Sequence, residues 1–343
     1  MGHNIPIMND CAIAQSLLTI AIPTYNRAAK LRRLLTVIQE EVATSCLQGS
    51  VVVLVSDNAS IDETPSVASE FSDSNISLEY YRQPENLGFD GNLRFLYDKA
   101  QTDYIWYISD DEIPLPGSIS TIYQTLQDTN PDVLLFSFAQ PPGSTVRQFD
   151  YQESVHLVTD QVLSIEHILR YTKLSIFVIR KINFNNYQWR TLDENIGSGW
   201  YYISLAFSVL EASQSLLLAI ISKSLATCDE DYTCISYTPL PFLHMDKMVA
   251  HPFVMKHQSN LTEFYACEGY CQAIQFAFAA KVGSLSPEYP EEYDKFIKEL
   301  ECKISILLKR PRSLLQFIAL KMHITCLWLI INPVIRWIKY LPR

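Results

Sequence analysis

The segment that decides the fold is Tyr104-Ile-Trp-Tyr-Ile-Ser-Asp-Asp-Glu-Ile-Pro-Leu-Pro-Gly117. Its first five residues are apolar or aromatic and predict a buried strand over 104–108. The strand ends at three consecutive acids, Asp110 to Glu112, whose like charges repel one another when they are unpaired. A divalent cation held by oxygen ligands, usually together with phosphate oxygens, relieves that repulsion. The segment therefore predicts a cation site at the end of a buried strand.

Strands and helices alternate along the first half of the chain. Further apolar runs predict strands over 17–22, 51–55, 77–81 and 133–138. Helices are expected between them, over about 28–47, from 62 onward and over 92–99. Continuous apolar strands separated by helices indicate an α/β protein with a mostly parallel sheet that is covered on both faces.

Polar clusters follow three of these strands immediately, at 23–27, 56–60 and 109–112. In parallel sheets of this kind, ligands bind beyond the carboxyl ends of the strands. The three clusters are therefore expected to converge at one edge of the sheet and to form a single site.

The second half of the chain is less regular. A strand over 174–179, a helix over 199–211 and a strand over 216–221 are predicted. Residues 223–255 are interpreted as a loop-rich stretch. Helices are expected over about 260–282 and 288–309, and a helical, apolar end over 312–341.

Charge is distributed unevenly along the chain. The net charge of −10 argues against nucleic acid as a partner, yet eight basic residues and no acid follow Glu301. The longest uncharged run there, 322–335, is shorter than the ~20 residues that span a bilayer. We interpret the end as a helix lying in the plane of an anionic membrane surface, with packing on the protein body as the alternative.

The cysteines and the N-terminus indicate the compartment. Eight scattered cysteines show no CxxC spacing, and the N-terminal segment has no apolar run of signal-peptide length. These features favour a reducing cytoplasm. With the basic end of the chain, they predict a peripheral protein at the inner face of the plasma membrane.

Four segments in order carry a family resemblance. They are Ile22-Pro-Thr-Tyr-Asn-Arg27, Val55-Ser-Asp-Asn-Ala-Ser-Ile-Asp-Glu-Thr64, Asn86-Leu-Gly-Phe-Asp-Gly-Asn92 and Ser109-Asp-Asp-Glu112. The chain resembles the non-processive family 2 glycosyltransferases of the GT-A fold that act in cell-surface polysaccharide biosynthesis. The resemblance is strong over about 15–140 and fades after about 200.

The resemblance implies a fold and a division of the chain. It implies a GT-A, Rossmann-like sheet, mostly parallel and flanked by helices, with a C-terminal helical extension. We expect a nucleotide-sugar-binding and catalytic domain over 1–225, acceptor-side loops and helices over 226–311, and a membrane-associating tail over 312–343.

It also implies roles for residues that contact the nucleotide of a nucleotide-sugar. Pro23, Tyr25 and Arg27 line the base and ribose pocket, and Asp57 accepts a hydrogen bond from the imide of uracil or thymine. The remaining members shape the turn or lie under the nucleotide: Asn58, Ser60, Asn86, Gly88 and Asn92. From the residues alone, Asp57 also suits a hydrogen bond to its own turn, and Tyr25 and Arg27 suit an ordinary helix entry.

The acidic strand end departs from the family pattern. The family commonly shows Asp-x-Asp here, whereas Ser109 takes the first position unless the register begins at Asp110. The resemblance implies that Asp111 ligates Mg2+ or Mn2+, which bridges the donor diphosphate, with Asp110 beside it. Glu112 is a candidate supporting group, and the departure leaves metal dependence open.

A general base is also required, because inverting transfer deprotonates the acceptor hydroxyl. The resemblance implies an acid at the head of a late helix, and Asp193 and Glu194 lie in about that region. The alternative is a solvated acid favoured there by the helix dipole. Trp200, Tyr201 and Tyr202 suit either an acceptor platform or the core.

The hypothesis is an inverting glycosyltransferase that uses a nucleotide-sugar, most simply a UDP-sugar, and a glycan or lipid-linked saccharide acceptor. It would act in surface polysaccharide or O-antigen-type biosynthesis. A catalytically silent nucleotide-sugar-binding protein on the same fold is the alternative. Nucleotidyl transfer ranks last, because no Gly-rich, basic loop follows the first strand.

Overall fold

The computed structural model describes residues 16–72, 74–140, 142–228, 241, 244–257 and 296–300. The chain forms two compact units. The first comprises Met1–Gly197 and Tyr201–Glu230, and the second comprises Ser198–Trp200 and Asp231–Arg343. The expected boundaries at 225 and 311 stay predictions.

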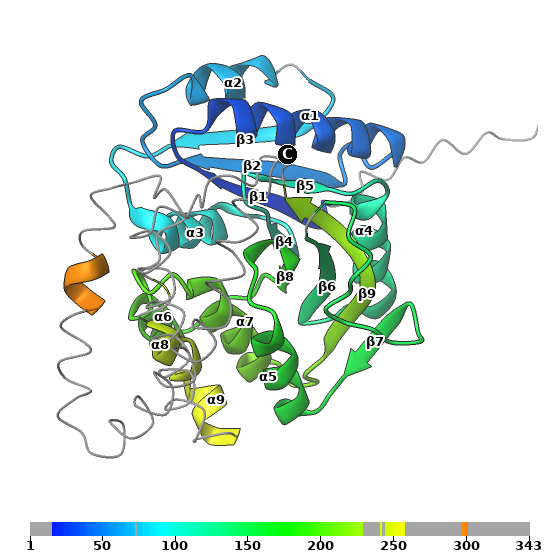
Figure 1. Cartoon of the computed structure of the whole chain (residues 1–343), viewed down its shortest axis with the longest axis vertical. Coiled ribbons are helices and arrows are strands. Elements are labelled where there is room, and N and C mark those ends of the chain that lie inside the picture. Colours follow the sequence, from blue (N-terminus) through cyan, green and yellow to red (C-terminus); the bar gives the residue numbers. More distant parts are fainter. Residues whose placement is uncertain are drawn as a thin grey trace, which may run out of the picture. The chain divides into compact units, whose positions relative to one another are not determined.

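The first unit is built on one sheet, which has nine strands among the described residues (Figure 1). The strands are β1 (Leu18–Thr24), β2 (Val51–Asp57), β3 (Ser77–Arg82), β4 (Tyr104–Tyr107), β5 (Glu112–Pro114), β6 (Val133–Ala139), β7 (Val155–Val158), β8 (Phe177–Arg180) and β9 (Leu218–Cys228). Their order is β3-β2-β1-β4-β8-β6-β9-β5, and β7 pairs with β9. The first four of these form a parallel block, and β6 pairs with β9 in parallel too.

The register of the parallel block decides where the site lies. Strand β1 runs beside β2 until Thr24 stands opposite Asp57, and β4 ends at Tyr107 opposite Ala21. Strand order reverses at β1, with β2 and β3 on one side and β4 on the other. Such a switch point opens a crevice at the carboxyl ends of the strands. The predicted mostly parallel α/β sheet is confirmed.

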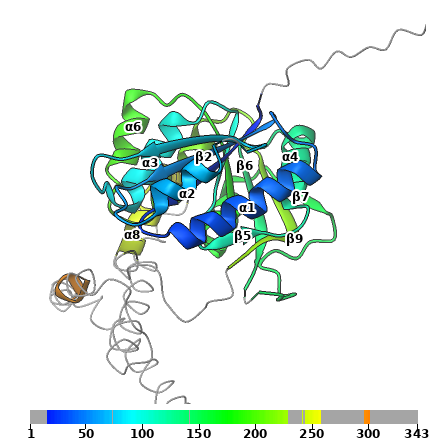
Figure 2. The same ribbon diagram turned by 90° about the horizontal axis from the view of Figure 1, so that it is seen from above.

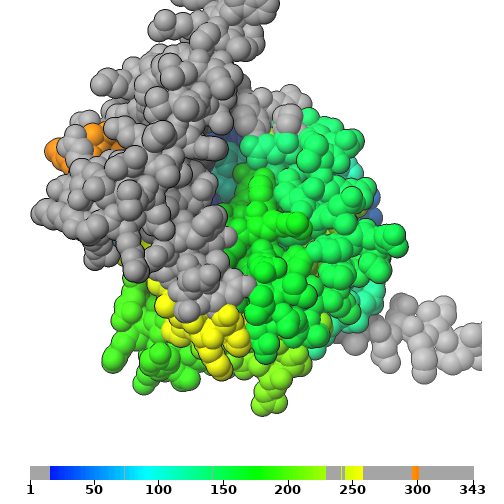
Figure 3. Space-filling view, turned by 60° about the horizontal axis from the view of Figure 1, so that its bottom comes forward, coloured from blue at the N-terminus to red at the C-terminus, as the bar shows by residue number. Residues whose placement is uncertain are grey.

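Helices cover both faces of this sheet (Figure 2). They are α1 (Ala28–Thr44), α2 (Thr64–Glu70), α3 (Gly88–Lys99), α4 (Ser118–Thr129), α5 (Gln161–Arg170), α6 (Asn186–Asp193) and α7 (Tyr201–Ala212). Helices α1 and α2 lie on one face, and α3 and α7 lie on the other. The apolar stripe predicted for α1 is buried, at Leu31, Leu34, Leu35, Ile38 and Val42. Figure 3 shows part of the surface that β7 and α5 form.

The short strands β5 and β7 and the full length of β9 were not predicted. Strand β5 has three residues, Glu112 to Pro114, and pairs with the end of β9 at Cys228 to Ala226. A short run with an acid and a proline carries no strand pattern of its own, so this strand depends on tertiary pairing. The loop-rich interpretation is therefore wrong for 223–228. The strand predicted over 174–179 begins instead with a 3-10 turn, Leu174–Ile176, before β8.

The second unit contains α8 (Met245–Val249), α9 (Pro252–His257) and helical residues 296–300. Trp200 Nε1 donates to the carbonyl of Pro241 at 2.7 Å. Gly199 has φ +80°, and a Cβ there would lie 2.3 Å from the Pro241 ring, so glycine is required. The helix predicted over 260–282, most of that over 288–309, and the tail over 312–343 lie outside the described residues. Within the described residues, no helix combines the length and apolarity needed to cross a bilayer.

Candidate active site

Hydrogen bonds join the three polar segments at the carboxyl edge of the sheet. The Thr24 hydroxyl donates to Asp110 Oδ2 at 2.7 Å, which links the end of β1 to the turn after β4. The Asn58 N–H donates to the Thr24 carbonyl at 2.9 Å, and the Asn26 N–H donates to Ser60 Oγ at 2.8 Å. The predicted convergence of the segments after β1, β2 and β4 is therefore confirmed.

Asp57 is fully buried at the end of β2 and already accepts two hydrogen bonds. The Ser60 N–H donates to Oδ1 at 2.8 Å, and the Tyr80 hydroxyl donates to Oδ2 at 2.6 Å. Arg82 Nε lies 3.9 Å from Oδ2. The role of Asp57 in its own turn is thus present, and a carboxylate retains lone pairs for a further donor.

Tyr80 and Arg82 are site residues that the sequence reasoning missed. Both lie on β3, where the parallel register sets Arg82 opposite Asp57. That register was the available signal, because β3 was predicted correctly. Burial and the hydrogen bond to Asp57 raise the pKa of Tyr80, so its phenol stays a donor at neutral pH.

The loop before α3 is tied to the turn after β2. Asn58 Nδ2 donates to Asn86 Oδ1 at 2.8 Å, and the Leu87 N–H donates to Asn58 Oδ1 at 2.8 Å. Gly88 has φ +73° and donates its N–H to Asn86 Oδ1. Asn92 is buried and bonds Ser56 through both ends of its amide, at 2.6 and 3.0 Å. Asn86 and Gly88 thus lie at the exposed edge, whereas Asn92 fixes α3 to β2.

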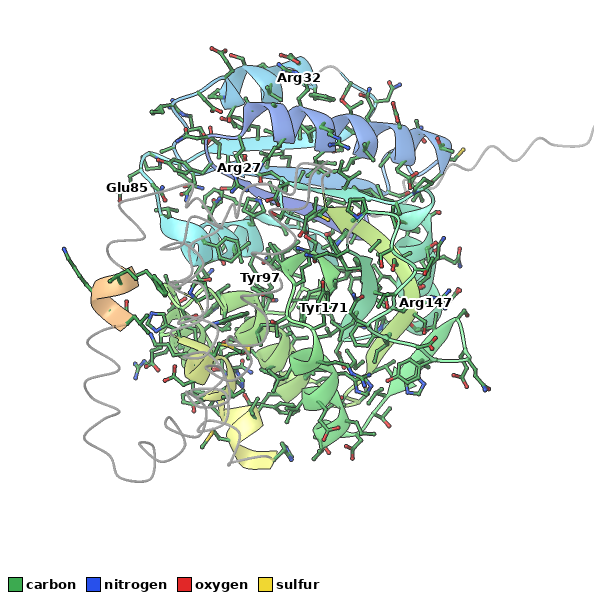
Figure 4. The ribbon with its side chains drawn as sticks, in the orientation of Figure 1. Arg27, Arg32, Glu85, Tyr97, Arg147 and Tyr171 are labelled. Atoms are coloured by element: carbon green, nitrogen blue, oxygen red, sulfur yellow. The ribbon has the colours of Figure 1, made fainter. Side chains whose placement is uncertain are left out.

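Arg27, labelled in Figure 4, contacts two carboxylates of the acidic strand end. Arg27 Nη1 is 2.9 Å from Asp110 Oδ1 and 3.4 Å from Asp111 Oδ2. Burial raises the pKa of Asp110, and the Arg27 guanidinium opposes that shift. The structure therefore brings Arg27 to the acidic end, on the other side of β1 from Asp57. Pro23 is buried within β1, and Tyr25 is half-buried after it.

Ser109 takes part in the same arrangement. Its hydroxyl donates to Asp111 Oδ1 at 2.6 Å, and its N–H donates to Ser175 Oγ at 3.0 Å. The departure from Asp-x-Asp therefore supplies a hydroxyl that orients the Asp111 carboxylate. Asp111 has a side-chain exposure of 22%, against 3% for Asp110, so it is the more accessible acid of the two.

Glu112 is buried in β5 and forms an ion pair with Lys173. Glu112 Oε2 is buried and has no hydrogen-bond partner, and Lys173 Nζ also lies 4.5 Å from the centre of the Phe138 ring. Burial raises the pKa of Glu112 against the attraction of Lys173. Burial lowers the pKa of Lys173, but Glu112 more than offsets this and raises it above its ordinary value. The two buried acids of the strand end, Asp110 and Glu112, are thus each paired with a basic side chain.

The candidate bases lie at the end of α6. Asp193 is the last residue of that helix, Glu194 follows it, and both are exposed. Arg94 on α3 donates from Nε to Asp193 Oδ1 at 3.1 Å, and its guanidinium lies 3.6 Å from the centre of the Trp189 ring. Both acids therefore lie at the C-terminal end of a helix, not at the head of one as the resemblance implied. The helix-dipole alternative is wrong for the same reason, because the dipole disfavours negative charge at this end.

The aromatic residues after the candidate bases are buried. Exposures are 7% for Trp200, 0% for Tyr201 and 4% for Tyr202. The exposed acceptor platform is therefore wrong for these side chains, and the core alternative holds. Tyr202 lies on α7, and its hydroxyl donates to the carbonyl of Thr172, just before Lys173.

Among the residues that the structure describes, no group of three or more His, Cys, Asp or Glu side chains is arranged to hold a metal ion. Mg2+ in nucleotide sites takes one or two carboxylates, and phosphates and water supply its other ligands. Asp111 fits that single-carboxylate role, because it is partly exposed at the edge of the sheet.

The fold is similar to that of S. aureus TarS. The structure of TarS residues 1–349 in complex with UDP-GlcNAc gives a TM-score of 0.55 at 13% identity, covering 83% of this chain and 80% of that one. The complex with UDP gives 0.55 at 14% identity, covering 76% and 72%. At these identities the likeness shows the fold alone, and the predicted GT-A fold is confirmed.

Two curated enzymes are similar in sequence. Abequosyltransferase RfbV of Salmonella typhimurium is 27% identical over 235 residues, which are 63% of this chain and 67% of that enzyme. The GalNAc(5)-diNAcBac-PP-undecaprenol beta-1,3-glucosyltransferase of Campylobacter jejuni is 25% identical over 133 residues, 38% of this chain and 41% of that enzyme.

The model of Glycosyl transferase family 2 matches residues 19–202, more than half of the chain. The matched region begins within β1 and contains β2 to β4, the Asp57 turn and the acidic strand end. This chain therefore belongs to glycosyl transferase family 2.

Proposed function

We propose that the protein is an inverting glycosyltransferase that moves a sugar from a UDP-sugar to a glycan or lipid-linked saccharide, in surface polysaccharide or O-antigen-type biosynthesis. The carrying observation is the hydrogen-bonded convergence of Thr24, Asn58 and Asp110 at the switch point of the sheet. The names of the similar enzymes support the reaction class: one is an abequosyltransferase, and one acts on an undecaprenol-linked saccharide. The TarS complexes with UDP-GlcNAc and UDP support the choice of donor.

The carboxyl edge of the sheet carries different groups on the two sides of β1, which fits a nucleoside diphosphate. Asp57, Asn58 and Asn86 offer hydrogen-bonding groups for a base. Arg27 and Asp111, across β1, offer charged groups for the diphosphate. A bound Mg2+ or Mn2+, held by Asp111, would neutralise the charge of the departing nucleoside diphosphate.

Asp57→Asn is expected to weaken UDP binding by about 10- to 100-fold, because a hydrogen bond to a charged acceptor is worth ~1.5–3 kcal/mol. Asparagine still accepts the Ser60 N–H, so the turn is retained. Calorimetric titration with UDP measures the effect. Asp150→Asn is the matched control. Asp150 is exposed and lies 4.0 Å from Arg147, and Figure 4 shows Arg147 well away from Arg27. Unchanged UDP affinity in a folded Asp57→Asn protein would remove the base-recognition role.

A transfer assay, run beside the same titration, separates the enzyme from its alternative. A glycosyltransferase binds UDP and transfers sugar from a UDP-sugar to at least one member of a panel of glycan and polyprenol-linked acceptors. Tight UDP binding with no transfer to any acceptor, in the presence of Mn2+, would favour the catalytically silent binding protein.

We propose Glu194 before Asp193 as the general base. Both acids are exposed, and Asp193 is already held by Arg94, which leaves Glu194 as the preferred candidate. Glu194→Gln is expected to lower kcat by about 100-fold or more. Asp193→Asn is expected to lower kcat less, through the loss of the link between α3 and α6. Glu166→Gln on α5 is the isosteric control, and steady-state transfer rates provide the measurement. Full activity in both variants would exclude this segment as the source of the base.

Peripheral membrane contact through 312–343 is proposed from the sequence, because those residues lie outside the described ones. Eight basic residues and no acid after Glu301 favour an anionic bilayer surface at the inner face of the plasma membrane. Truncation after Arg310 is expected to move the protein from the membrane fraction to the soluble fraction of a cell lysate. An unchanged distribution on sedimentation would contradict the proposal.

A further inference from the structure

One nitrogen of Arg27 serves two carboxylates at the acidic strand end. Nη1 lies 2.9 Å from Asp110 Oδ1 and 3.4 Å from Asp111 Oδ2. The Arg27 side chain is only 13% exposed, so its charge is poorly screened by solvent. The guanidinium therefore occupies the position of a cation shared by the two acids.

The two contacts of Arg27 differ in strength. Asp110 is buried, lies at the shorter distance, and is held in place by the Thr24 hydroxyl at 2.7 Å. Asp111 is 22% exposed and lies at the longer distance, and Ser109 orients it from its other oxygen. Asp110 thus anchors Arg27, whereas Asp111 is able to exchange one cation for another without leaving its turn.

We propose that Arg27 is a resident counter-ion that competes with a divalent cation for Asp111, so that the free protein binds the cation weakly and a nucleoside diphosphate strengthens that binding. This inference rests on the proposed function, since it assigns Asp111 to the diphosphate end. A divalent ion held by Asp111 would be repelled by the Arg27 guanidinium, whose Nη1 lies 3.4 Å from the same carboxylate. Phosphate oxygens relieve this repulsion, because they attract both the divalent ion and the guanidinium.

The coupling between cation and nucleotide is reciprocal. If UDP raises the affinity for Mn2+ by some factor, Mn2+ raises the affinity for UDP by the same factor. Part of this coupling is attributed to the positive charge of Arg27. Removing its charge is therefore expected to tighten Mn2+ binding to the nucleotide-free protein and to reduce the further gain that UDP provides.

The experiment is a titration of the full chain with Mn2+ alone, in which electron paramagnetic resonance measures the concentration of free Mn2+. Arg27→Gln is expected to bind Mn2+ about tenfold or more tightly than the wild type, from the Coulomb energy of charges a few ångströms apart. Adding Asp111→Asn to Arg27→Gln is expected to remove that binding. Repeating the titrations with saturating UDP gives the coupling factor for each protein.

Arg32→Gln is the matched control on the same helix. Arg32 makes two contacts with Glu70 at the surface, of 2.9 and 2.5 Å, and Figure 4 shows it on the α2 side of α1, away from the acidic end. The substitution changes the net charge by the same amount as Arg27→Gln. Its Mn2+ affinity is expected to equal that of the wild type, which excludes a general charge effect.

A second variant covers the case in which Arg27→Gln fails to fold because Asp110 is left buried without its cation. The double variant Arg27→Gln, Asp110→Asn keeps the net charge of the wild type and retains an acceptor for Thr24. It is expected to bind Mn2+ more tightly than the single variant Asp110→Asn, in an Asp111-dependent manner, because these two proteins differ only at Arg27. Equal Mn2+ affinity with and without Arg27→Gln in folded proteins, or no binding in either at millimolar Mn2+, would overturn the inference.

The outcomes also separate this inference from the proposed function. Mn2+ binding that is lost in Asp111→Asn but unaffected by the Arg27 variants contradicts the role of Arg27 alone. Mn2+ binding that is unchanged by Asp111→Asn contradicts the assignment of Asp111, and with it the metal role in the proposed function.

Discussion

Asp111→Asn is expected to reduce the rate of sugar transfer by roughly 10²- to 10³-fold, since a preorganised group that stabilises developing charge contributes about that much. The substitution keeps the shape of the side chain and an acceptor for the Ser109 hydroxyl, 2.6 Å away. It removes the charge from the more accessible of the two acids beside Arg27. The measurement is transfer from a UDP-sugar with Mn2+ present.

Two comparisons make the result specific. Wild-type activity is expected to fall on chelation and to return with Mn2+, whereas Asp111→Asn is expected not to respond. Ser109→Ala, which removes only the hydroxyl that orients Asp111, is expected to lower the rate by about tenfold, as the loss of one hydrogen bond predicts. Full activity in Asp111→Asn would show that the metal role is wrong.

The strands and their polar ends were predictable because each carries a strong local signal. The runs ending at Thr24, Asp57 and Tyr107 are mostly apolar and almost wholly buried, and parallel pairing then brings their ends to one edge without further information. Strand β5 has no such signal. It exists because Glu112 to Pro114 meet the far end of β9, a pairing between residues more than a hundred positions apart.

Side-chain partners within the site were harder to predict than its location. The motif that contains Arg27 implied the base pocket, yet its guanidinium lies 2.9 Å from Asp110. The direction of a long side chain at a helix entry depends on which buried charge lacks a counter-ion, and sequence spacing does not encode that. Lys173 is a similar case, because its partner Glu112 lies 61 positions earlier and the two meet only through the sheet.

Lys173→Met is expected to destabilise the protein by about 3–5 kcal/mol, the usual effect of removing one partner from a buried ion pair. Glu112 is 4% exposed, and its Oε2 is already buried without a hydrogen-bond partner. Loss of the ammonium leaves its charge uncompensated in the core, one residue from Asp111. Urea denaturation at pH 8 measures the change in the free energy of unfolding.

The stability that Lys173→Met loses depends on pH with a definite sign. Burial raises the pKa of Glu112 from its ordinary 4.5, and loss of Lys173 raises it further. A carboxyl whose pKa is higher in the folded state destabilises the fold at high pH, and this effect disappears below its unfolded pKa. The deficit of Lys173→Met is therefore expected to be full at pH 8 and to shrink as the pH falls toward 4.5.

Two further variants test the cause of that deficit. Lys173→Met, Glu112→Gln removes both charges and is expected to recover most of the lost stability and to abolish its pH dependence, because no buried charge is left. Arg32→Met breaks the exposed pair with Glu70 and is expected to change stability little, since solvent already screens both partners. A Lys173→Met protein within about 1 kcal/mol of the wild type at pH 8 would mean that solvent reaches Glu112. The pair would then be dispensable for holding the strand that follows Asp111.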